Sequence, residues 1–266
     1  MRQTLHIAAL CLMGCPTWAR DIATVADIPP APIVIVGEVH DNPHHHQFQA
    51  DVIAAQRPSA VVFEMLSPEQ AAATSPELLG DAAALEAALG WEASGWADFD
   101  IYYPIFAALG EARVYGAAAP RDTVRAAIGS GAAAVFDGDA ARFGLDKPLP
   151  DAQQAAREAD QQVAHCNALP EQMLGGMVEA QRLRDATFAA VTAQALSDTG
   201  GPVIVITGNG HARRDRGIPA ALAHAGITDV IAYGQFEEPP EGDVPFDLWR
   251  VTDPVERDDP CAAFSK

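Results

Sequence analysis

The sequence predicts an α/β protein with a mostly parallel central sheet flanked by helices and an added helical part. Short apolar runs rich in β-branched residues, such as 33–36 and 203–206, end in glycine and then polar residues. This pattern is typical of buried parallel strands. Helix-forming stretches lie between these runs, and this alternation of strand and helix is the mark of α/β folds.

Composition favours one large domain. The chain has 266 residues, 49% of them hydrophobic, and can bury a sizeable core. A formal net charge of −19 argues against general binding to nucleic acid or to an anionic membrane surface, because both need a basic surface. We expect a single domain over 20–266 with helical excursions at about 67–110 and 150–197.

The first nineteen residues have the pattern of an export signal. Arg2 precedes a short apolar run, 5–14, and small residues follow up to Ala19. This run is too short to span a bilayer. Two processing routes remain open: cleavage after Ala19, or acylation of Cys15 in a lipobox-like sequence. We therefore expect a protein that is periplasmic or anchored to the membrane through a lipid on Cys15.

The first predicted strand, 33–36, continues into Gly37-Glu38-Val39-His40. Ligands bind at the carboxyl ends of strands in open α/β sheets, so Glu38 and His40 are candidate site residues. Alternatively, Glu38 caps the next helix, and the histidines at 44–46 form a solvated helix start after Pro43.

A helix is predicted over 46–55 and a second buried strand over 59–64, which ends on Glu64. Because parallel strands end at one edge of the sheet, Glu64 should reach the same edge as Glu38. Helices are expected in the alanine-rich stretch 67–89. An aromatic segment follows at 90–104, and it either packs in the core or forms an apolar wall for a flat ligand.

The next strand is predicted over 113–119 and its helix over 122–128, and a loop-rich stretch covers 129–150. The longest helical pattern, 169–196, places Met177, Gln181 and Asp185 four residues apart and so on one face. That face is either a solvated stripe or the polar lining of a site.

Gly201 to His211 repeats the opening pattern of a buried strand, a glycine-rich turn and a histidine. The spacing does not match a dinucleotide-binding fingerprint. Three arginines follow: Arg213, Arg214 and Arg216. They form either a local anion site or a solvated helix start.

Strands are expected at 228–234 and 246–251, and the tail from Asp253 should be an acidic loop. Cys166 and Cys261 are the two cysteines outside the leader. In an oxidising compartment they form one disulfide, and otherwise they are two unpaired thiols.

Four motifs together resemble the ChaN-like haem-binding uptake family, which is related to the Tiki, TraB and erythromycin esterase proteins. They are Gly37-Glu38-Val39-His40, Phe63-Glu64, the Met177-Gln181-Asp185 face and Gly208-Asn209-Gly210-His211. The resemblance implies an exported haem-binding protein that takes part in haem and iron uptake, with possible partners in an outer-membrane haem receptor and a second copy of the chain.

Under this resemblance, haem lies against the aromatic segment, and Tyr102 or a histidine binds the iron. The histidines at 44–46 and His165 are further ligand candidates. Arg121 or Arg213 would hold the propionates. The implied haem-binding residues are Tyr102, Arg121, Gln181, Asp185, His211 and Arg213. Phe99 replaces a tryptophan of the family's W-x-x-Y-x-P-like segment, and alanines before Pro120 replace an asparagine.

The esterase and Tiki branches imply a competing function. There, the equivalents of Glu38, His40, Glu64 and His211 resemble a hydrolytic centre that either binds a divalent metal or activates water directly. A third alternative is a periplasmic interaction protein that retains a relic of this site. Of the three, haem binding ranks first and the hydrolase second.

Overall fold

The computed structural model describes residues 20–22, 24–259 and 261–262. The predicted export signal and Cys15 lie outside these residues. Within the described part of the chain, no helix is long and apolar enough to cross a membrane.

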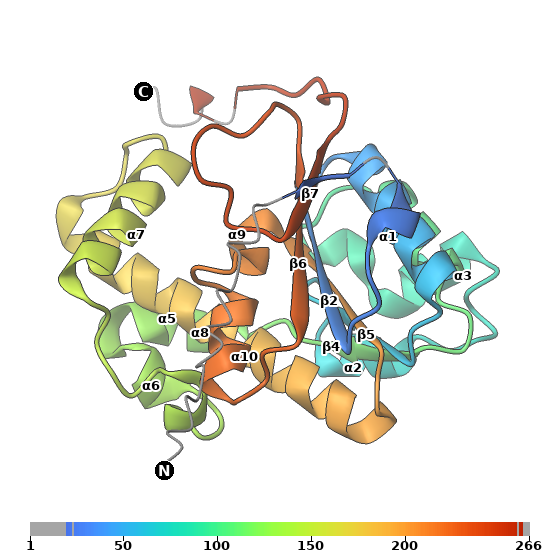
Figure 1. The fold of residues 1–266 in the computed structure, drawn as a ribbon, viewed down its shortest axis with the longest axis horizontal. Helices are drawn as coiled ribbons and strands as arrows, with labels where there is room; N and C mark the ends of the chain where they lie inside the picture. The colour runs from blue at the N-terminus through green and yellow to red at the C-terminus, as the bar shows by residue number, and fades with distance from the viewer. Residues whose placement is uncertain (1–19, 23, 260, 263–266) are drawn as a thin grey trace, which may run out of the picture.

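A seven-stranded sheet with every neighbouring pair parallel forms the centre of the molecule (Figure 1). Its order is β1-β7-β6-β2-β5-β3-β4. The strands are β1 (Arg20–Asp21), β2 (Ile33–Glu38), β3 (Ala60–Phe63), β4 (Arg113–Gly116), β5 (Val203–Gly208), β6 (Val230–Phe236) and β7 (Leu248–Val251). The predicted α/β fold with a parallel sheet is confirmed.

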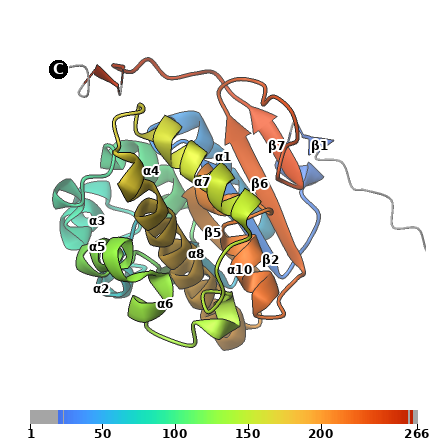
Figure 2. The same cartoon turned by 90° about the vertical axis from the view of Figure 1, so that its left-hand side faces the viewer.

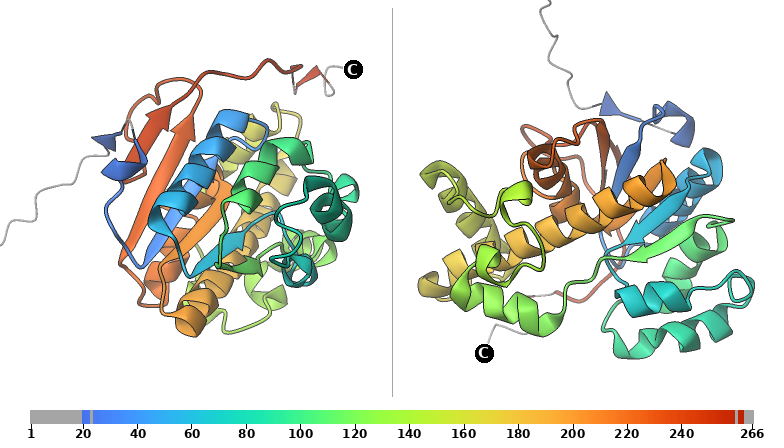
Figure 3. Two further views of the ribbon diagram at one scale, coloured as in Figure 1. Left: turned by 90° about the vertical axis from the view of Figure 1, so that its right-hand side faces the viewer. Right: turned by 90° about the horizontal axis from the view of Figure 1, so that it is seen from below.

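Helices cover both faces of the sheet. One face carries α1 (Pro43–Gln56), α2 (Pro68–Ala73), α3 (Ala82–Leu89) and α4 (Phe99–Ala107), and the other carries α5 (Arg121–Ser130), α6 (Ala132–Val135), α8 (Glu171–Thr199) and α10 (Ile218–His224) (Figure 3). Because side chains alternate along a strand, Val34 and Val36 pack on the first face while Ile33 and Ile35 pack on the second. Each strand therefore contributes to two cores.

The long helix α8 spans the second face, and α7 (Asp151–Ala164) packs on its outer side (Figure 2). No residue of α7 is buried, so this helix is an outer layer. These two helices correspond to the excursion predicted at about 150–197, and α2, α3 and α4 lie within the one predicted at about 67–110. Three short 3₁₀ helices complete the described chain: η1 (Val25–Asp27), η2 (Trp91–Ala93) and η3 (Ala141–Phe143).

Several boundaries differ from the prediction. The strand predicted over 113–119 ends at Gly116, and the stretch 129–150, predicted as loop-rich, contains α6 and η3. Helix α1 begins at Pro43 rather than at residue 46, because the Asn42 side chain accepts a hydrogen bond from the His44 amide and caps the helix. The solvated alternative for 44–46 is wrong for His45 and His46, which are fully buried, while His44 is exposed. Strand β1 was not predicted, because two residues are too few to form a pattern.

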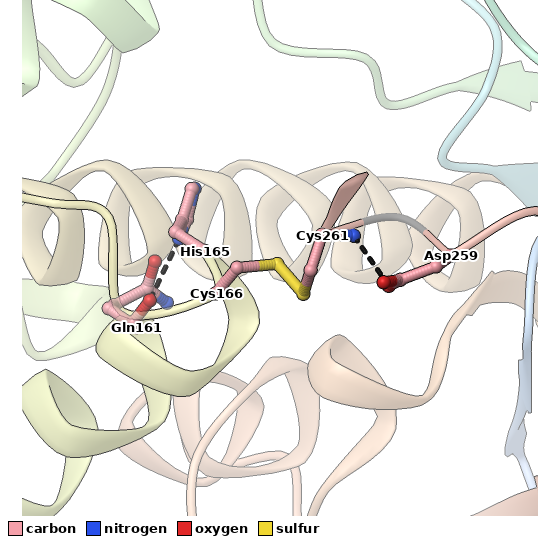
Figure 4. The surroundings of a disulfide bond; sticks show 5 residues. All are labelled: Gln161, His165, Cys166, Asp259 and Cys261. Carbon is pink, nitrogen blue, oxygen red and sulfur yellow. Dashed lines mark hydrogen bonds between the residues drawn. A yellow bond between two sulfur atoms is a disulfide. The ribbon is translucent and has the colours of Figure 1, made fainter. Parts of the chain in front are cut away.

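Cys166 and Cys261 form a disulfide that joins the end of α7 to the C-terminal tail (Figure 4). The bond closes a sequence separation of 95 residues. The alternative of two unpaired thiols is wrong.

Candidate functional site

The carboxyl ends of β2, β5 and β3 meet at one edge of the sheet and bring the predicted polar residues together. Strand β5 pairs with β2 on one side and with β3 on the other. Glu38 ends β2, Glu64 follows β3, and His211 lies in α9 (Asn209–Ala212), directly after β5. In the structure these residues converge at one sheet edge, as the sequence predicts.

The first half of the site is the pair formed by Glu38 and His40. Oε1 of Glu38 lies 2.7 Å from Nδ1 of His40. The Glu38 carboxylate also accepts hydrogen bonds from Gln49 Nε2 at 2.7 Å and from the Tyr102 hydroxyl at 3.0 Å. Burial alone would raise the pKa of Glu38, but His46 and His40 outweigh burial and hold the pKa well below its usual value. Glu38 is thus a buried anion that orients the His40 ring through Nδ1.

Asp185 and His211 form the second half. Oδ1 of Asp185 on α8 lies 2.6 Å from Nδ1 of His211. Burial would lower the pKa of His211, but the charges of Glu64 and Asp185 raise it above its usual value. Gln181, one turn before Asp185, approaches Nε2 of His211 at 3.5 Å. The Gln181–Asp185 face of α8 is therefore a polar lining and not a solvated stripe.

Glu64 lies between the two imidazoles. Its Oε1 is 3.9 Å from Nε2 of His40 and 3.7 Å from Nε2 of His211. Its Oε2 accepts hydrogen bonds from the Thr207 hydroxyl at 2.6 Å and from the Gly208 amide at 2.8 Å. Burial would raise the pKa of Glu64, but His211 and His40 lower it.

These five side chains form what we call the carboxylate–histidine row. Its members, in spatial order, are Glu38, His40, Glu64, His211 and Asp185. Each imidazole has a carboxylate at Nδ1 and faces Glu64 through Nε2, so the row is arranged to hold and move protons. In the ranges that the structure describes, no group of three or more His, Cys, Asp or Glu side chains is arranged to hold a metal ion.

A pocket of about 500 Å³ opens beside the row. The Trp96 ring forms one wall and lies 4.8 Å from the His40 ring, centroid to centroid. Two arginines line the same pocket: Arg121 donates to the Ser94 carbonyl at 2.7 Å, and Arg184 donates to Gln181 Oε1 at 3.2 Å. The remaining lining residues are Glu64, Met65, Gln70, Ser94, Gly95, Ala118, Ala119 and Phe188. A larger pocket of about 710 Å³ lies near Ser59 and Arg113, at the opposite edge of the sheet, and includes no member of the row.

Other predicted site residues lie elsewhere. Tyr102 is fully buried, and its hydroxyl donates to Glu38 and to the His40 carbonyl, so in this structure the hydroxyl does not face the pocket. Its role as an iron ligand stays a prediction. Of the aromatic segment, Trp91 and Phe99 pack in the core with Tyr102, and Trp96 faces the pocket.

The three clustered arginines are each in an ion pair with an aspartate. Arg213 pairs with Asp215, Arg214 with Asp247, and Arg216 with Asp160. None of them lines the pocket beside the row. His165 lies outside the row, at the end of α7, where its Nδ1 contacts the Gln161 carbonyl.

Sequence reasoning missed Arg184 and Phe188, which line the pocket from α8. A signal was present, because Met177, Gln181, Arg184 and Phe188 follow the spacing of one helix face. It also missed Gln49, whose amide contacts Glu38 from α1.

The chain matches one protein family and several solved structures. The family described as "Haem-binding uptake, Tiki superfamily, ChaN" matches residues 24–222. No curated protein sequence matches the chain.

Two solved structures match most of this chain. One, reported as cofacial haem binding to ChaN of Campylobacter jejuni, has a TM-score of 0.62 at 17% identity over 82% of this chain and 86% of that chain. The type III effector HopBA1 has a TM-score of 0.46 at 13% identity over 84% and 88% of the two chains. Since the family match extends over most of the sequence and includes every member of the carboxylate–histidine row, this chain belongs to the haem-binding uptake, ChaN family of the Tiki superfamily.

Proposed function

We propose that the chain binds haem in the pocket beside the carboxylate–histidine row, with His40 as the iron ligand. The observation that carries this proposal is a pocket lined by Trp96 and two arginines, with the His40 ring 4.8 Å from the Trp96 ring. It is supported by membership of a haem-binding family.

The residues present fit the chemical needs of haem. The macrocycle needs flat apolar contacts, which Trp96 and Phe188 offer. The two propionates need cations, and neither Arg121 nor Arg184 forms an ion pair with a carboxylate within the described chain. Since the whole chain carries a net charge of −19, two such arginines in one pocket favour an anionic ligand.

The iron needs a ligand whose lone pair can face the pocket. Imidazole is a common axial ligand, and a carboxylate on its other nitrogen orients the ring and raises its basicity. The His40 side chain is 37% exposed and is held at Nδ1 by Glu38. The bound haem would supply the redox and ligand-binding chemistry of its iron. Glu38 would fix the His40 ring, and the proton on Nε2 would be released to solvent when the ring binds iron.

A haemin titration followed by absorbance tests this proposal. Wild-type protein is expected to give a saturable Soret shift, which His40→Ala changes in position and weakens at least about tenfold in affinity. His44→Ala is the matched control, because His44 is an exposed histidine four residues further along the chain. If Tyr102→Phe abolishes the shift and His40→Ala keeps it, the ligand role returns to Tyr102.

A separate measurement tests whether the arginines bind the propionates. Arg184→Gln is expected to weaken binding of haem about tenfold and to leave binding of its dimethyl ester unchanged, because the ester has no carboxylate for Arg184 to pair with. Equal losses for both compounds would contradict a propionate contact.

A second candidate function is hydrolysis by acid–base catalysis without a metal. The observation that favours it is Glu64 Oε1, which lies 3.9 Å and 3.7 Å from two imidazole Nε2 atoms. In this reaction Glu64 accepts a proton from water and His211 donates one to the leaving group. Turnover of nitrophenyl esters that falls at least about 100-fold in both Glu64→Gln and His211→Ala, without haem, would support this function. Equal turnover in wild type and both variants would exclude it.

We further propose that the protein acts outside the cytoplasm in haem and iron uptake. The Cys166–Cys261 disulfide supports this location, because such bonds persist in oxidising compartments. Cell fractionation and mass spectrometry of the processed N-terminus distinguish a protein cleaved after Ala19 from one acylated at Cys15. An outer-membrane haem receptor and a second copy of the chain are the expected partners.

A further inference from the structure

The described chain after β7, residues 252–259 and 261–262, runs from the sheet edge toward the end of α7 (Figure 1). We call this segment the C-terminal clasp. On its way it contacts the loop 39–42, which carries His40. The clasp lies wholly beyond residue 222, where the match to the family ends.

Arg257 makes the central contact of the clasp. Its guanidinium donates to both Asp41 oxygens, at 2.8 and 2.9 Å, and to both Glu237 oxygens, at 2.6 Å each. Hydrogen bonds from Arg257 and Asn42 lower the pKa of Glu237 to about 2. A single exposed ion pair contributes little, but here one guanidinium holds two carboxylates with bidentate geometry. Arg257 thus links the residue next to His40 to the end of β6.

Asn42 and His45 also hold the loop 39–42 in place. Asn42 Nδ2 donates to Glu237 at 2.8 Å and to the Asp253 carbonyl at 3.1 Å. His45 Nδ1 accepts the Val39 amide at 2.9 Å, and its Nε2 lies 2.9 Å from the Thr252 hydroxyl. Burial lowers the pKa of His45 to about 4, so the neutral ring accepts from Val39 and donates to Thr252. The clasp therefore holds the residues after His40 directly, at Asp41 and Asn42, and the residue before it through His45.

The far end of the clasp is covalently fixed. Cys261 is bonded to Cys166, at the end of α7, and α7 packs on α8, which carries Asp185 (Figure 4). The clasp therefore connects the His40 side of the carboxylate–histidine row with the helices behind the Asp185–His211 side.

We infer that the C-terminal clasp positions His40, and that Arg257 is the positioning residue through which it acts. This inference rests on the proposed function, in which His40 binds haem iron. With the clasp in place, His40 is held in one geometry before haem arrives, and preorganisation of this kind slows dissociation.

The test combines a measurement without haem and one with it, on the full chain after removal of any leader. Arg257→Gln is expected to speed amide exchange in the loop 39–42 about tenfold, because it removes charge-assisted hydrogen bonds. Exchange at β5 should stay unchanged, which separates local opening from global unfolding. Arg257→Lys should give an intermediate rate, since lysine keeps the charge without the bidentate geometry.

With haem bound, Arg257→Gln is expected to raise the haem dissociation rate about tenfold, without removing the Soret band. Arg125→Gln, an exposed arginine paired with Asp122, is the matched control and should behave as wild type in both measurements. The double variant Cys166→Ser/Cys261→Ser should change loop exchange in the same direction as Arg257→Gln.

The results distinguish three claims: the existence of the clasp, the positioning role of Arg257 and the binding of haem. Unchanged loop exchange in Arg257→Gln would overturn the clasp, whether or not haem binds. Faster loop exchange with an unchanged haem dissociation rate would overturn the positioning role. If the wild-type chain binds no haem, the proposed function fails, and loop exchange alone still decides whether the clasp exists.

Discussion

The protonation state of His40 decides what its Nε2 atom can bind. Burial would lower the pKa of His40, but the hydrogen bond that His40 donates to Glu38 and the charges of Glu38 and Glu64 raise it to about 9. At neutral pH the ring is therefore an imidazolium, and its Nε2 carries a proton. Binding of iron by His40 must release that proton.

Haem affinity should therefore rise with pH. Below a pKa of about 9, the unprotonated fraction of His40 grows about tenfold per pH unit, and the affinity is expected to follow it between pH 6 and 8. Haemin titrations at three pH values and constant ionic strength measure the slope. His40→Ala should remove it, and a wild-type affinity independent of pH would contradict ligation by an imidazolium that loses its proton.

Substitution of Glu64 should change both imidazoles. In Glu64→Gln the central negative charge is absent, so burial acts on His211 with less opposition, and the pKa values of His211 and His40 should both fall. Titration of the imidazole resonances by NMR measures the shift. Glu92→Gln, an exposed glutamate, should leave both values unchanged. Unaltered pKa values in Glu64→Gln would mean that the row is not electrostatically coupled.

For single residues of the site, the sequence predicts the polar side chains at the ends of the strands. Glu38, Glu64 and His211 were found because parallel strands end at one edge. The spacing of α8 places Arg184 on the same helix face as Gln181, but that this face lines the pocket depends on how α8 packs against the sheet, which no local pattern encodes. The sequence does not show that the arginines after His211 are neutralised, because the aspartates that pair with Arg214 and Arg216 are distant in sequence.

Close packing between neighbouring elements sets the shape of the region around β3 and β4. A methyl group added to Gly116 on β4 would overlap the backbone carbonyl of Ser67, which begins α2. Backbone cannot yield as a flexible side chain can, so this glycine is required by close approach and not by its φ angle.

Gly116→Ala should therefore lower the free energy of unfolding by about 1–3 kcal/mol. Gly129→Ala is the matched control, because this exposed glycine of α5 has no atom within 4 Å of the added methyl. That change should raise the free energy of unfolding by roughly 0.5 kcal/mol through helix propensity. Urea unfolding of both variants measures the difference, and equal stability of the two would contradict the packing argument.

Among the elements, long periodic or strongly apolar segments were predictable and short ones were not. The strands at the centre of the sheet and the helix α8 follow from composition and period. Strand β1 and the clasp have no such signal, since Arg20–Asp21 depends on β7 and Arg257 depends on partners at 41 and 237.

Across the whole molecule, the site makes stability depend on pH. His40 and His211 have raised pKa values in the folded state. Their contribution is fully present below the unfolded value of about 6.5 and is lost as the pH rises through the folded value, which is about 9 for His40. Glu237, with its pKa lowered to about 2, contributes above about 4.5 and loses that contribution as the pH falls through about 2.

The free energy of unfolding should thus fall between pH 6.5 and 9, and less steeply in His40→Ala. Urea unfolding at pH 6, 7, 8 and 9 measures this slope for both proteins. A wild-type stability that stays constant or rises over this range would show that the imidazoles are not charged in the folded chain.

The position of β5 between β2 and β3 also determines at which stage of synthesis and folding the protein can bind its ligand. Glu64 contacts Gly208, 144 residues later in the chain, and without β5 the strands that carry Glu38 and Glu64 have nothing between them. Contacts of this range form late in folding. A nascent chain that has not yet released residues 203–211 from the ribosome, or one that crosses a membrane unfolded, has no assembled site. Haem can therefore load only after folding has brought β5 between β2 and β3.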